Sequence, residues 1–344
     1  MPSVPARQAT LRDIADTVGV SYQTVWRVVN DRPHVAEATR ARVLKALRET
    51  DYRPHRAAQV LTTGKSYLIQ LIVFEYGHND RLPALLHWAR EYGYSIVVSE
   101  LEGPPSSEGL RSALRESSQM VDGVILVLPY AELTHDEMRD LCSDLPYVVV
   151  NTKMSSRMPS VVTDQWAGAR SAMDYLLDLG HVRIAEVSGP AGHCDADMRH
   201  RAWQVFQQQR GLTANPALSV TAEYDVGAGY EGTKRLLSRD VPFTALYAGS
   251  DHIALGAMRA MREAGLRIPE DVSVVGFDDI PEAAYLEPPL TTVRQDFEAV
   301  GKEAVEFLVS FIENPGMNVH QRVLYPELII RESTKKLEAS LTQV

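Results

Sequence analysis

Four side chains near the amino terminus have the chemistry to recognise nucleic acid. They lie in the run SYQTVWRVVN at 21–30, which presents Tyr22, Gln23 and Arg27 beside the small hydroxyl of Ser21. A guanidinium offers two donors to guanine O6 and N7, and a glutamine amide can pair with adenine or guanine edges. Small hydroxyls suit contacts to the sugar–phosphate backbone. Residues of these types at this spacing indicate a surface that binds DNA.

Two short helices are predicted to position this surface. A capping-box pattern at 10–13 begins a helix at about Leu11, and Gly19 stands where a left-handed residue can end it. Ser21 is a second N-cap candidate, and the apolar stripe within 25–29 predicts a second helix of about nine residues. Two helices across a short turn with glycine predict a helix-turn-helix, whose second helix fits a major groove.

A third helix is predicted from about Glu37 to Thr50. We expect Val43, Leu44 and Leu47 to face inward. The outward positions are basic: Arg40, Arg42, Lys45 and Arg48. Each helix pair taken alone also fits a plain αα-hairpin, but the polar and aromatic face of the second helix favours DNA binding.

Charge separates this head from the rest of the chain. Residues 1–66 hold 11 basic and 6 acidic side chains, whereas the remainder holds 24 and 39, for a total of −10. The overall charge argues against nucleic acid, but a basic head on an acidic body predicts that only the head binds a polyanion. A chance excess of basic residues on a solvated surface is the alternative.

The body alternates short apolar runs with helical patterns. The runs are 67–74, 94–100, 123–129, 147–151, 161–164, 183–189, 244–249 and 272–279. Apolar strands separated by amphipathic stretches predict βαβ crossovers and parallel sheets that are buried on both faces. Because 344 residues exceed what one core usually organises, we expect two such sheets.

Polar residues at the ends of these runs define a candidate ligand site. In open parallel sheets ligands bind beyond the carboxyl ends of the strands. That rule selects Phe74–Gly77, Asn151, Thr163-Asp164, Ser188–Pro190, Gly249–Asp251 and Asp278-Asp279. We therefore expect a small molecule to bind in the crevice between two lobes.

The head resembles the DNA-binding domain of the LacI/GalR family. The similarity runs through SYQTVWRVVN, the following DRPHVAEATRARVLKAL and YRPHRAAQVL at 52–61. It implies that base edges are read by Tyr22, Gln23 and Arg27, and that phosphates are contacted by Ser21, Thr24, Asn30, His34 and Thr39. Trp26 replaces the small residue usual in the family and is included among the DNA-contacting residues.

Residues 53–66 are predicted to form a hinge helix and linker. The segment is too short to be a stable helix alone, so it should become helical on DNA. The resemblance implies that it pairs with its dimer mate in the minor groove, where Leu61 wedges between base pairs. The other implied contacts are His55, Arg56, Ala58 and Gln59. A simple linker is the alternative.

The body resembles the periplasmic-binding-protein-like core of the same family. The predicted fold class is α/β, with an N-terminal all-α helix-turn-helix head at 1–52 and two Rossmann-like parallel-sheet lobes. The resemblance implies a strand swap. The effector-binding N-lobe would comprise 67–162 and 291–322, the C-lobe 163–290 and 323–333, and a tail 334–344.

The most specific motif of the body is SDHIALGAMRAMREAGLRIPEDVSVVGFDD at 250–279. The resemblance makes Asp278 an acceptor for ligand hydroxyls, with Arg199 as its partner on the opposite wall of the cleft. A carboxylate and a guanidinium each make two hydrogen bonds with vicinal hydroxyls, so we expect a sugar. The other implied effector-binding residues are Phe74, Tyr76, Asn151, Asp164, Asp195, Tyr224, Ser250 and Gln295. A structural Arg–Asp pair that braces the lobes is the alternative.

Aromatic residues are candidates to stack on a sugar face. They are Trp166 and Tyr224, and each is equally compatible with an ordinary place in the core. PLTTVRQDF at 289–297 also resembles the family and implies that Gln295 and Phe297 lie near the cleft and the interface.

The predicted function is sequence-specific DNA binding by a transcriptional regulator. We expect a homodimeric repressor of carbohydrate-utilisation genes that binds palindromic double-stranded operator DNA. A mono- or disaccharide between the lobes would act as inducer and release it. A corepressor-type regulator, in which the ligand promotes DNA binding, stays open, and a sugar-binding carrier protein is a further alternative.

We expect neither an enzyme nor a bound cofactor or metal. The pair Asp278-Asp279 suggests a glycosidase, but adjacent strand residues point to opposite faces of the sheet. Cys142 and Cys194 have neither a disulfide framework nor zinc-site spacing. No run of about 18 uncharged apolar residues occurs, so we expect no membrane contact and a cytoplasmic location.

Overall fold

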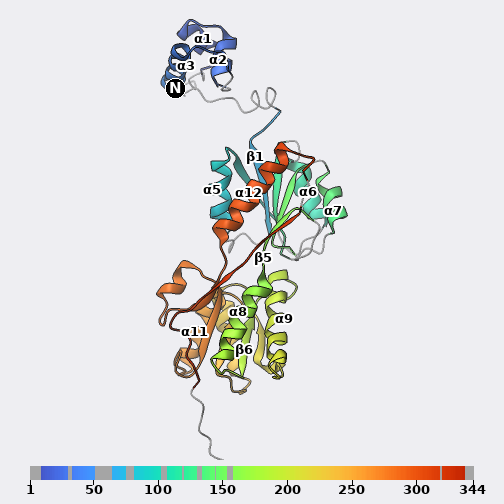
Figure 1. Cartoon of the computed structure of the whole chain (residues 1–344), viewed down its shortest axis with the longest axis vertical. Coiled ribbons are helices and arrows are strands. Elements are labelled where there is room, and N and C mark those ends of the chain that lie inside the picture. The colour runs from blue at the N-terminus through green and yellow to red at the C-terminus, as the bar shows by residue number, and fades with distance from the viewer. Residues whose placement is uncertain are drawn as a thin grey trace, which may run out of the picture. The chain divides into compact units, whose positions relative to one another are not determined.

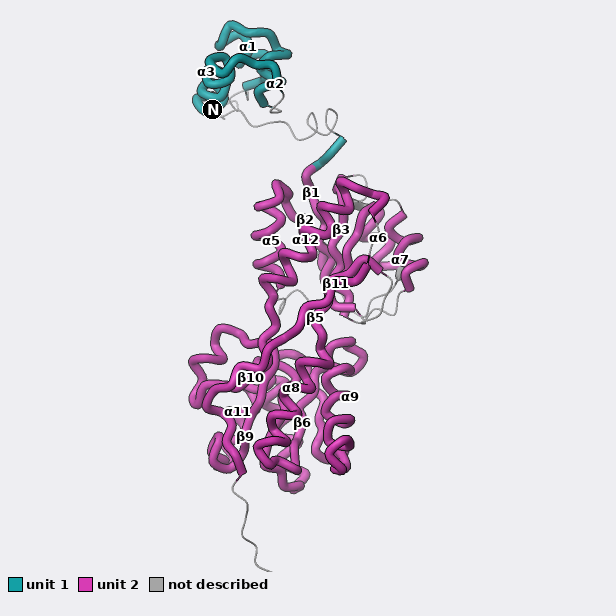
Figure 2. The backbone as a smooth tube through the Cα atoms, in the orientation of Figure 1, with its two compact units in different colours: residues 1–66 teal, residues 67–344 magenta. Residues whose placement is uncertain are grey.

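The chain forms two compact units, Met1–Ser66 and Tyr67–Val344, and each is described here by itself (Figure 2). The coordinates are a computed structural model of the chain. They describe residues 9–29, 33–50, 64–74, 81–101, 107–117, 120–129, 134–143, 145–152, 158–317 and 320–337. None of the helices in these ranges combines the length and the hydrophobicity that a membrane span requires.

The first unit is built on three helices, α1 (Leu11–Val18), α2 (Tyr22–Val29) and α3 (Glu37–Glu49). The predicted capping box is confirmed, because the Asp13 amide donates to Thr10 Oγ1 and the Thr10 amide donates back to the Asp13 carboxylate. Gly19 ends α1 with a φ of 69°. The predicted helix-turn-helix is therefore present.

The core of this unit takes one fully buried side chain from each helix, Ile14, Val25 and Val43. Leu44 does not face inward as predicted, because it is 41% exposed, and Ala46 is buried instead. Positions three and four residues apart share a helix face, so Val43 groups with Ala46 and the partly buried Leu47, while Leu44 is turned away.

The second unit contains two sheets, one in each lobe. The N-lobe sheet has the order β11-β5-β4-β3-β1-β2, and every neighbouring pair is parallel. Its strands are β1 (Leu68–Phe74), β2 (Ser95–Leu101), β3 (Gly123–Val127), β4 (Tyr147–Val150), β5 (Ser160–Thr163) and β11 (Gln321–Leu324). One face is covered by α5 (Leu82–Glu91) and α12 (Phe297–Glu313), and the other by α6 (Ser107–Ser117) and α7 (His135–Cys142) (Figure 1).

The C-lobe sheet has the order β12-β10-β9-β8-β6-β7. Its strands are β6 (Ile184–Ser188), β7 (Ser219–Thr221), β8 (Ala245–Ala248), β9 (Ser273–Asp278), β10 (Thr291–Arg294) and β12 (Glu327–Ile329). Only β12 runs antiparallel to its neighbour within this sheet. The sheet packs with the helix pair α8 (Gln165–Asp178) and α9 (Cys194–Gln209) and the pair α10 (Val226–Leu237) and α11 (Asp251–Glu263). Each of the eight apolar runs predicted to be strands overlaps one strand of the structure, and β2 and β5 each extend one residue beyond their runs.

The chain passes between the lobes three times. The crossovers join β5 to α8, β10 to α12 and β11 to β12. The second and third crossovers lie slightly later in the sequence than the predicted lobe boundaries at 291 and 323. Thr291–Arg294 pairs in parallel with β9 of the C-lobe, and Gln321–Leu324 pairs with β5 of the N-lobe. Strand pairing therefore assigns 291–294 to the C-lobe and 323–324 to the N-lobe.

Two glycines let α10 and α11 touch backbone to backbone. A Cβ atom on Gly256 would overlap the Val226 carbonyl oxygen, and one on Gly229 would lie 2.5 Å from that of Ile253. The contact fixes the start of α11 at the end of β8, where Ser250 caps the helix by accepting from the Ile253 amide.

The segment after β12 docks on the C-lobe through buried polar contacts. The Ser333 hydroxyl donates to the Val274 carbonyl over 2.6 Å, and His181 Nε2 lies 3.1 Å from the Lys335 carbonyl oxygen. A carbonyl only accepts, so Nε2 carries the imidazole proton and Nδ1 accepts from the Thr244 hydroxyl 3.0 Å away.

Gly256→Ala should destabilise the C-lobe by about 2 kcal/mol, because the new methyl group meets backbone atoms rather than a movable side chain. Urea unfolding of the whole chain measures the change. Gly316→Ala is the matched control, since a Cβ there meets nothing within 4 Å. Equal midpoints for both variants would contradict the close helix crossing.

Burial lowers the pKa of His181, so the folded protein keeps this side chain neutral as the pH falls. The unfolded chain takes up the proton near pH 6.5. The free energy of unfolding should therefore decrease below about pH 6.5. Urea unfolding at pH 7.5 and 5.5 should show a smaller decrease for His181→Gln than for the wild type, and identical decreases would refute the assignment.

Candidate functional site

The DNA-binding candidates on α2 lie on the face opposite the head core. Tyr22 is 48% exposed, and Gln23 and Arg27 are also exposed, whereas Val25 and Val28 are buried. Trp26 is half-buried. The structure thus presents the three predicted base-reading side chains together on the surface of a helix.

Two interactions fix α2 within the head. The Ser21 hydroxyl accepts from the Thr24 amide over 3.2 Å and lies 2.9 Å from the Thr24 hydroxyl, which caps the helix. The Arg42 guanidinium of α3 donates to the Val18 carbonyl at the end of α1. The turn between α1 and α2 is therefore held by hydrogen bonds at both of its ends.

The remaining DNA-contact predictions divide into two groups. His34 is exposed with a φ of 70°, and Thr39 is half-buried in the first turn of α3. Outside the described residues lie Asn30, Tyr76 of the effector set, and the hinge residues His55, Arg56, Ala58, Gln59 and Leu61. All of these roles stay predictions.

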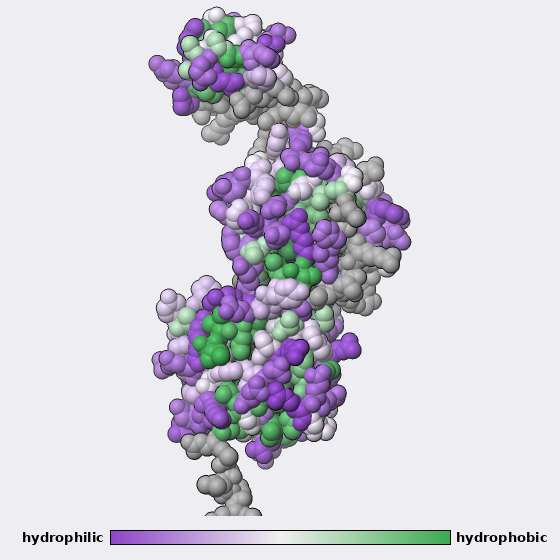
Figure 3. Space-filling model, viewed as in Figure 1, coloured by the Kyte–Doolittle hydropathy of each residue, from purple (hydrophilic) through white to green (hydrophobic). Residues whose placement is uncertain are grey.

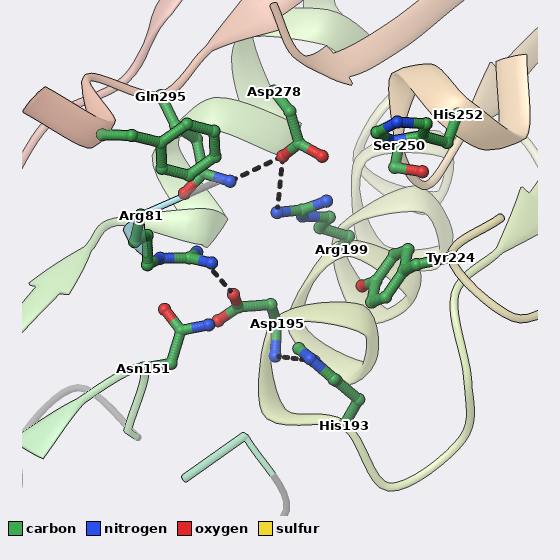
Figure 4. Close-up of a pocket in the computed structure, with 11 residues that line it drawn as sticks. Arg81, Asn151, His193, Asp195, Arg199, Tyr224, Ser250, His252, Asp278 and Gln295 are labelled. Carbon is green, nitrogen blue, oxygen red and sulfur yellow. Dashed lines mark hydrogen bonds and ion pairs between the residues drawn. The ribbon is translucent and has the colours of Figure 1, made fainter. Parts of the chain in front are cut away.

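A pocket lies between the two lobes of the second unit (Figure 4). Seven of the ten predicted effector residues line it: Asn151, Asp195, Arg199, Tyr224, Ser250, Asp278 and Gln295. Phe297, which the resemblance placed near the cleft, also lines it. The carboxyl ends of β4, β8 and β9 supply three of these residues, as the rule for parallel sheets predicts.

Two predicted effector residues lie elsewhere. Phe74 is 5% exposed in the N-lobe core, because strand alternation turns its ring toward α6 and α7. Asp164 caps α8 by accepting from the Ala167 amide over 2.9 Å. Trp166, a candidate to stack on sugar, packs against Phe206 with 5.1 Å between ring centroids. The structure assigns these three side chains to cores and a cap.

Arg81, His193 and His252 line the pocket but were missed in the sequence. His252 comes one residue after the range selected by the strand-end rule, so a slightly wider window would have included it. Arg81 and His193 lie within connecting segments further from any strand end. No sequence signal singles them out.

Arg199 and Asp278 form a charged pair within the C-lobe wall of the pocket, and do not lie on opposite walls as predicted. Arg199 Nη2 of α9 is 3.4 Å from Asp278 Oδ1 at the end of β9, and the arginine is only 3% exposed. Arg199 Nη1 also donates to the Gly249 carbonyl, and its guanidinium lies 3.6 Å from the centroid of the Phe277 ring. These contacts leave the pair rigidly placed at the edge of the cavity.

A second charged pair joins the lobes. Arg81, directly before α5 of the N-lobe, places Nη2 3.7 Å from Asp195 Oδ2 on α9 of the C-lobe, as Figure 4 shows. The Cys194 amide donates to the Pro129 carbonyl of the N-lobe over 2.8 Å. The start of α9 is therefore the point at which the C-lobe touches the opposite wall.

Burial holds three titratable groups in or beside the pocket in their uncharged forms. Burial lowers the pKa of His193 to about 4, and its Nδ1 accepts from the Asp195 amide over 3.2 Å. Burial raises the pKa of the Cys194 thiol, so no thiolate nucleophile forms. Burial also raises the pKa of Tyr224 well above its usual value. This chemistry suits the binding of a ligand more than its reaction.

The carboxylates of Asp278 and Asp279 accept hydrogen bonds from different side chains. Asp278 Oδ1 accepts from Gln295 Nε2 over 2.6 Å, while Asp279 accepts from Arg294 and from Arg331. Their φ angles of 112° and 57° turn the chain sharply after β9. The two carboxylates thus do not form a facing pair across one sugar bond, which agrees with the argument against a glycosidase.

Comparison with known domain families gives two matches. Residues 10–55 match the bacterial regulatory proteins of the lacI family, and residues 173–334 match a periplasmic binding protein-like domain. Among solved structures, the lac repressor dimer bound to operator and the anti-inducer ONPF aligns with a TM-score of 0.85 and 30% identity, covering 96% of this chain and 100% of that chain. A complex of the transcriptional regulator CelR with cellobiose aligns with a TM-score of 0.70 and 28% identity, covering 94% and 99%.

Curated relatives align along nearly the whole chain. The lactose operon repressor of Escherichia coli K12 is 31% identical, with 95% of this chain and 91% of the relative covered. The repressor PurR of Histophilus somni 129Pt is 32% identical, with 96% and 100% covered. These relatives are transcriptional repressors and not enzymes. The chain therefore belongs to the LacI family and is a transcriptional regulator with a helix-turn-helix DNA-binding head and a periplasmic-binding-protein-like core.

Proposed function

We propose that this regulator is a repressor that leaves its operator when a neutral, hydroxyl-rich sugar fills the pocket between its lobes. The observation that carries the proposal is the balanced charge of the lining, where Arg81 and Arg199 face Asp195 and Asp278. A guanidinium donates hydrogen bonds to hydroxyl oxygens, and a carboxylate accepts hydrogen bonds from hydroxyl groups. Equal numbers of guanidinium and carboxylate groups favour a ligand without net charge.

The aromatic rings of the pocket support a sugar over a purine. The Tyr224 ring meets His193 edge-on at 5.1 Å and lies 6.0 Å from the Arg199 guanidinium. The Phe297 ring is covered by Arg81, whose guanidinium carbon lies 4.8 Å from its centroid. Bases gain much of their affinity from stacking on open aromatic faces. Here an arginine guanidinium lies over one face of each ring, which leaves less room for a base to stack there.

The proposed DNA-binding mode uses two heads on a palindromic operator. Tyr22, Gln23 and Arg27 would enter the major groove of each half-site, while Ser21, Thr24, Asn30, His34 and Thr39 contact phosphates. The hinge within 53–66 would pair with its mate at the centre of the operator. The solved lac repressor dimer bound to operator, to which the chain aligns, supports this arrangement.

A homodimer is proposed for the same reason, and exposed apolar residues support it. Val97 and Val98 on the edge strand β2, Leu86 on α5 and Tyr92 directly after α5 are at least 36% exposed, and Tyr285 of the C-lobe is 88% exposed. Figure 3 shows apolar surface on each lobe amid polar residues. Exposed apolar surface of this kind marks contacts between proteins.

A second candidate function reverses the sign of the ligand effect. In this scheme the ligand promotes DNA binding. Operator affinity measured with and without ligand gives the sign directly. The two schemes share the pocket and the head, and they differ only in which lobe orientation the ligand stabilises.

Arg27→Ala should weaken binding to a selected operator about 5- to 100-fold and relax base preference, because a bidentate contact to guanine is lost. Selection from random duplexes followed by fluorescence anisotropy measures both effects. Arg48→Ala removes the same charge from an exposed site on α3 and serves as the matched control. Equal losses of affinity, with unchanged base preference in both variants, would contradict base reading by Arg27.

Asp278→Asn should leave operator binding intact and weaken the ligand by about 10- to 100-fold, because a charged hydrogen-bond acceptor is lost from the pocket. Thermal shift of the whole protein with lactose, cellobiose and D-ribose tests this, with guanine and hypoxanthine as comparison ligands. Asp178→Asn, at an exposed ion pair, is the control. A shift with a purine and with none of the sugars would overturn the proposed ligand class.

A further inference from the structure

Three buried side chains and the half-buried Asp278 form a closed hydrogen-bonded ring beside the ligand pocket. Arg199 Nε donates to Gln165 Oε1 over 2.9 Å, and Gln165 Nε2 donates to Gln295 Oε1 over 2.9 Å. Gln295 Nε2 then donates to Asp278 Oδ1 over 2.6 Å, and Arg199 Nη2 closes the ring at 3.4 Å from the same oxygen. Gln165 does not line the pocket, while the other three members do.

The ring joins the charged pair of the pocket to two of the three crossovers. Gln165 is the first residue of α8, directly after the chain leaves β5, and Gln295 follows β10 just before α12. The hydrogen bond between these two amides therefore links two crossovers that are far apart in the sequence. Any change in the angle between the lobes has to rotate the backbone in these segments.

The polarity of the ring is fixed by its two charged members. A guanidinium can only donate hydrogen bonds, and an ionised carboxylate can only accept them. Both amides must therefore point the same way around the ring, from Arg199 through Gln165 and Gln295 to Asp278. Turning either amide would place two donors or two acceptors against each other. A change in one of the four side chains therefore alters the hydrogen bonds of the other three.

The ring also has little access to water. Arg199 and Gln165 are each 3% exposed, and Gln295 is 4% exposed. A broken hydrogen bond in such a place leaves a donor or acceptor without a replacement partner. The four side chains are thus expected to rearrange together rather than one at a time.

We propose that Gln165 is a positioning residue that transmits the state of the Arg199–Asp278 pair to the crossovers and so couples ligand binding to the angle between the lobes. The proposal rests on the proposed function, in which the sugar binds this pair. Hydroxyls that bind Asp278 Oδ1 or the Arg199 guanidinium compete with the ring for the same atoms. The amides of Gln165 and Gln295 then shift, and the two crossovers shift with them.

Hydrogen exchange of the full-length protein without ligand tests the linkage itself. Gln165→Met keeps the length of the side chain but removes both ring contacts. We expect the backbone amides of residues 294–300 to exchange about tenfold faster, although they lie far from position 165 in the sequence. Gln207→Met is the matched control, since Gln207 is 2% exposed and its Nε2 donates to the Trp203 carbonyl outside the ring.

Faster exchange confined to residues near the substituted position, with 294–300 unchanged, would overturn the proposal. The proposal also fails if the Gln207 control alters 294–300 as strongly as Gln165→Met does. Because this experiment contains no sugar, its result does not depend on which ligand the pocket takes.

Gln165→Glu tests the consequence for switching. The new carboxylate can still accept a hydrogen bond from Arg199. Its second oxygen, however, replaces the donor that faced the Gln295 amide oxygen, so two acceptors oppose each other and the donor-to-acceptor order of the ring is lost. We expect operator affinity without ligand to stay within about twofold of the wild type, and the change caused by saturating lactose, cellobiose or D-ribose to fall about tenfold. Sugar affinity of the free protein, from calorimetry, should change far less.

If sugar changes the operator affinity of the Gln165→Glu variant as much as that of the wild type, the proposed coupling role of Gln165 is wrong. A parallel loss of sugar affinity and switching would instead make Gln165 part of the binding site and equally overturn it. If none of the three sugars binds the wild type, the proposed ligand class fails, and the exchange experiment alone decides the role of Gln165.

Discussion

The contact between Arg199 and Asp278 is the constraint on which the rest of the core depends. A guanidinium that is almost completely buried has to have its donors satisfied. Arg199 meets this need with the Asp278 carboxylate, the Gly249 carbonyl, the Gln165 amide oxygen and the Phe277 ring. These partners come from β8, β9 and the first crossover, so one side chain ties together the elements that form the C-lobe wall.

Two other aspartates hold the turn that presents Asp278. Asp251 is fully buried and accepts from the Ile280 amide over 2.9 Å and from the Thr292 hydroxyl, while burial raises its pKa. Asp279 is bound by Arg294 and Arg331. Left-handed φ values at Asp278 and Asp279 cost free energy. The surrounding hydrogen bonds offset that cost and keep the pocket carboxylate aimed at the cavity.

The sequence predicts those features that depend on local chemistry. Thr10 and Asp13 specify a helix start, Gly19 specifies its end, and apolar runs specify eight strands. The short strands β7 and β12, of three residues each, lack enough sequence to show a period. The prediction that Leu44 is buried was wrong, because the apolar character of a residue in a helix does not by itself put it on the buried face.

The site was predicted best where a strand end or a family motif marks a residue, as at Asn151, Ser250 and Asp278. Arg81 and Gln165 were not found, because their importance comes from partners distant in the sequence: Asp195 for Arg81, and Arg199 and Gln295 for Gln165. Such pairings follow from how the lobes are packed, and no local pattern encodes them. Phe74 and Asp164 show the converse, since a strand end alone does not decide where a side chain points.

The triple passage of the chain between the lobes also bears on how the protein is made. The three helices of the head end at Glu49, so this unit has all of its core residues early in synthesis. The N-lobe sheet gains its last strand only at Leu324, and the C-lobe gains β12 at Ile329 and its docked tail at Leu337. A message cut short before these codons would yield a DNA-reading head attached to two unfinished sheets, so the ability to sense a ligand is the last property that the nascent protein acquires.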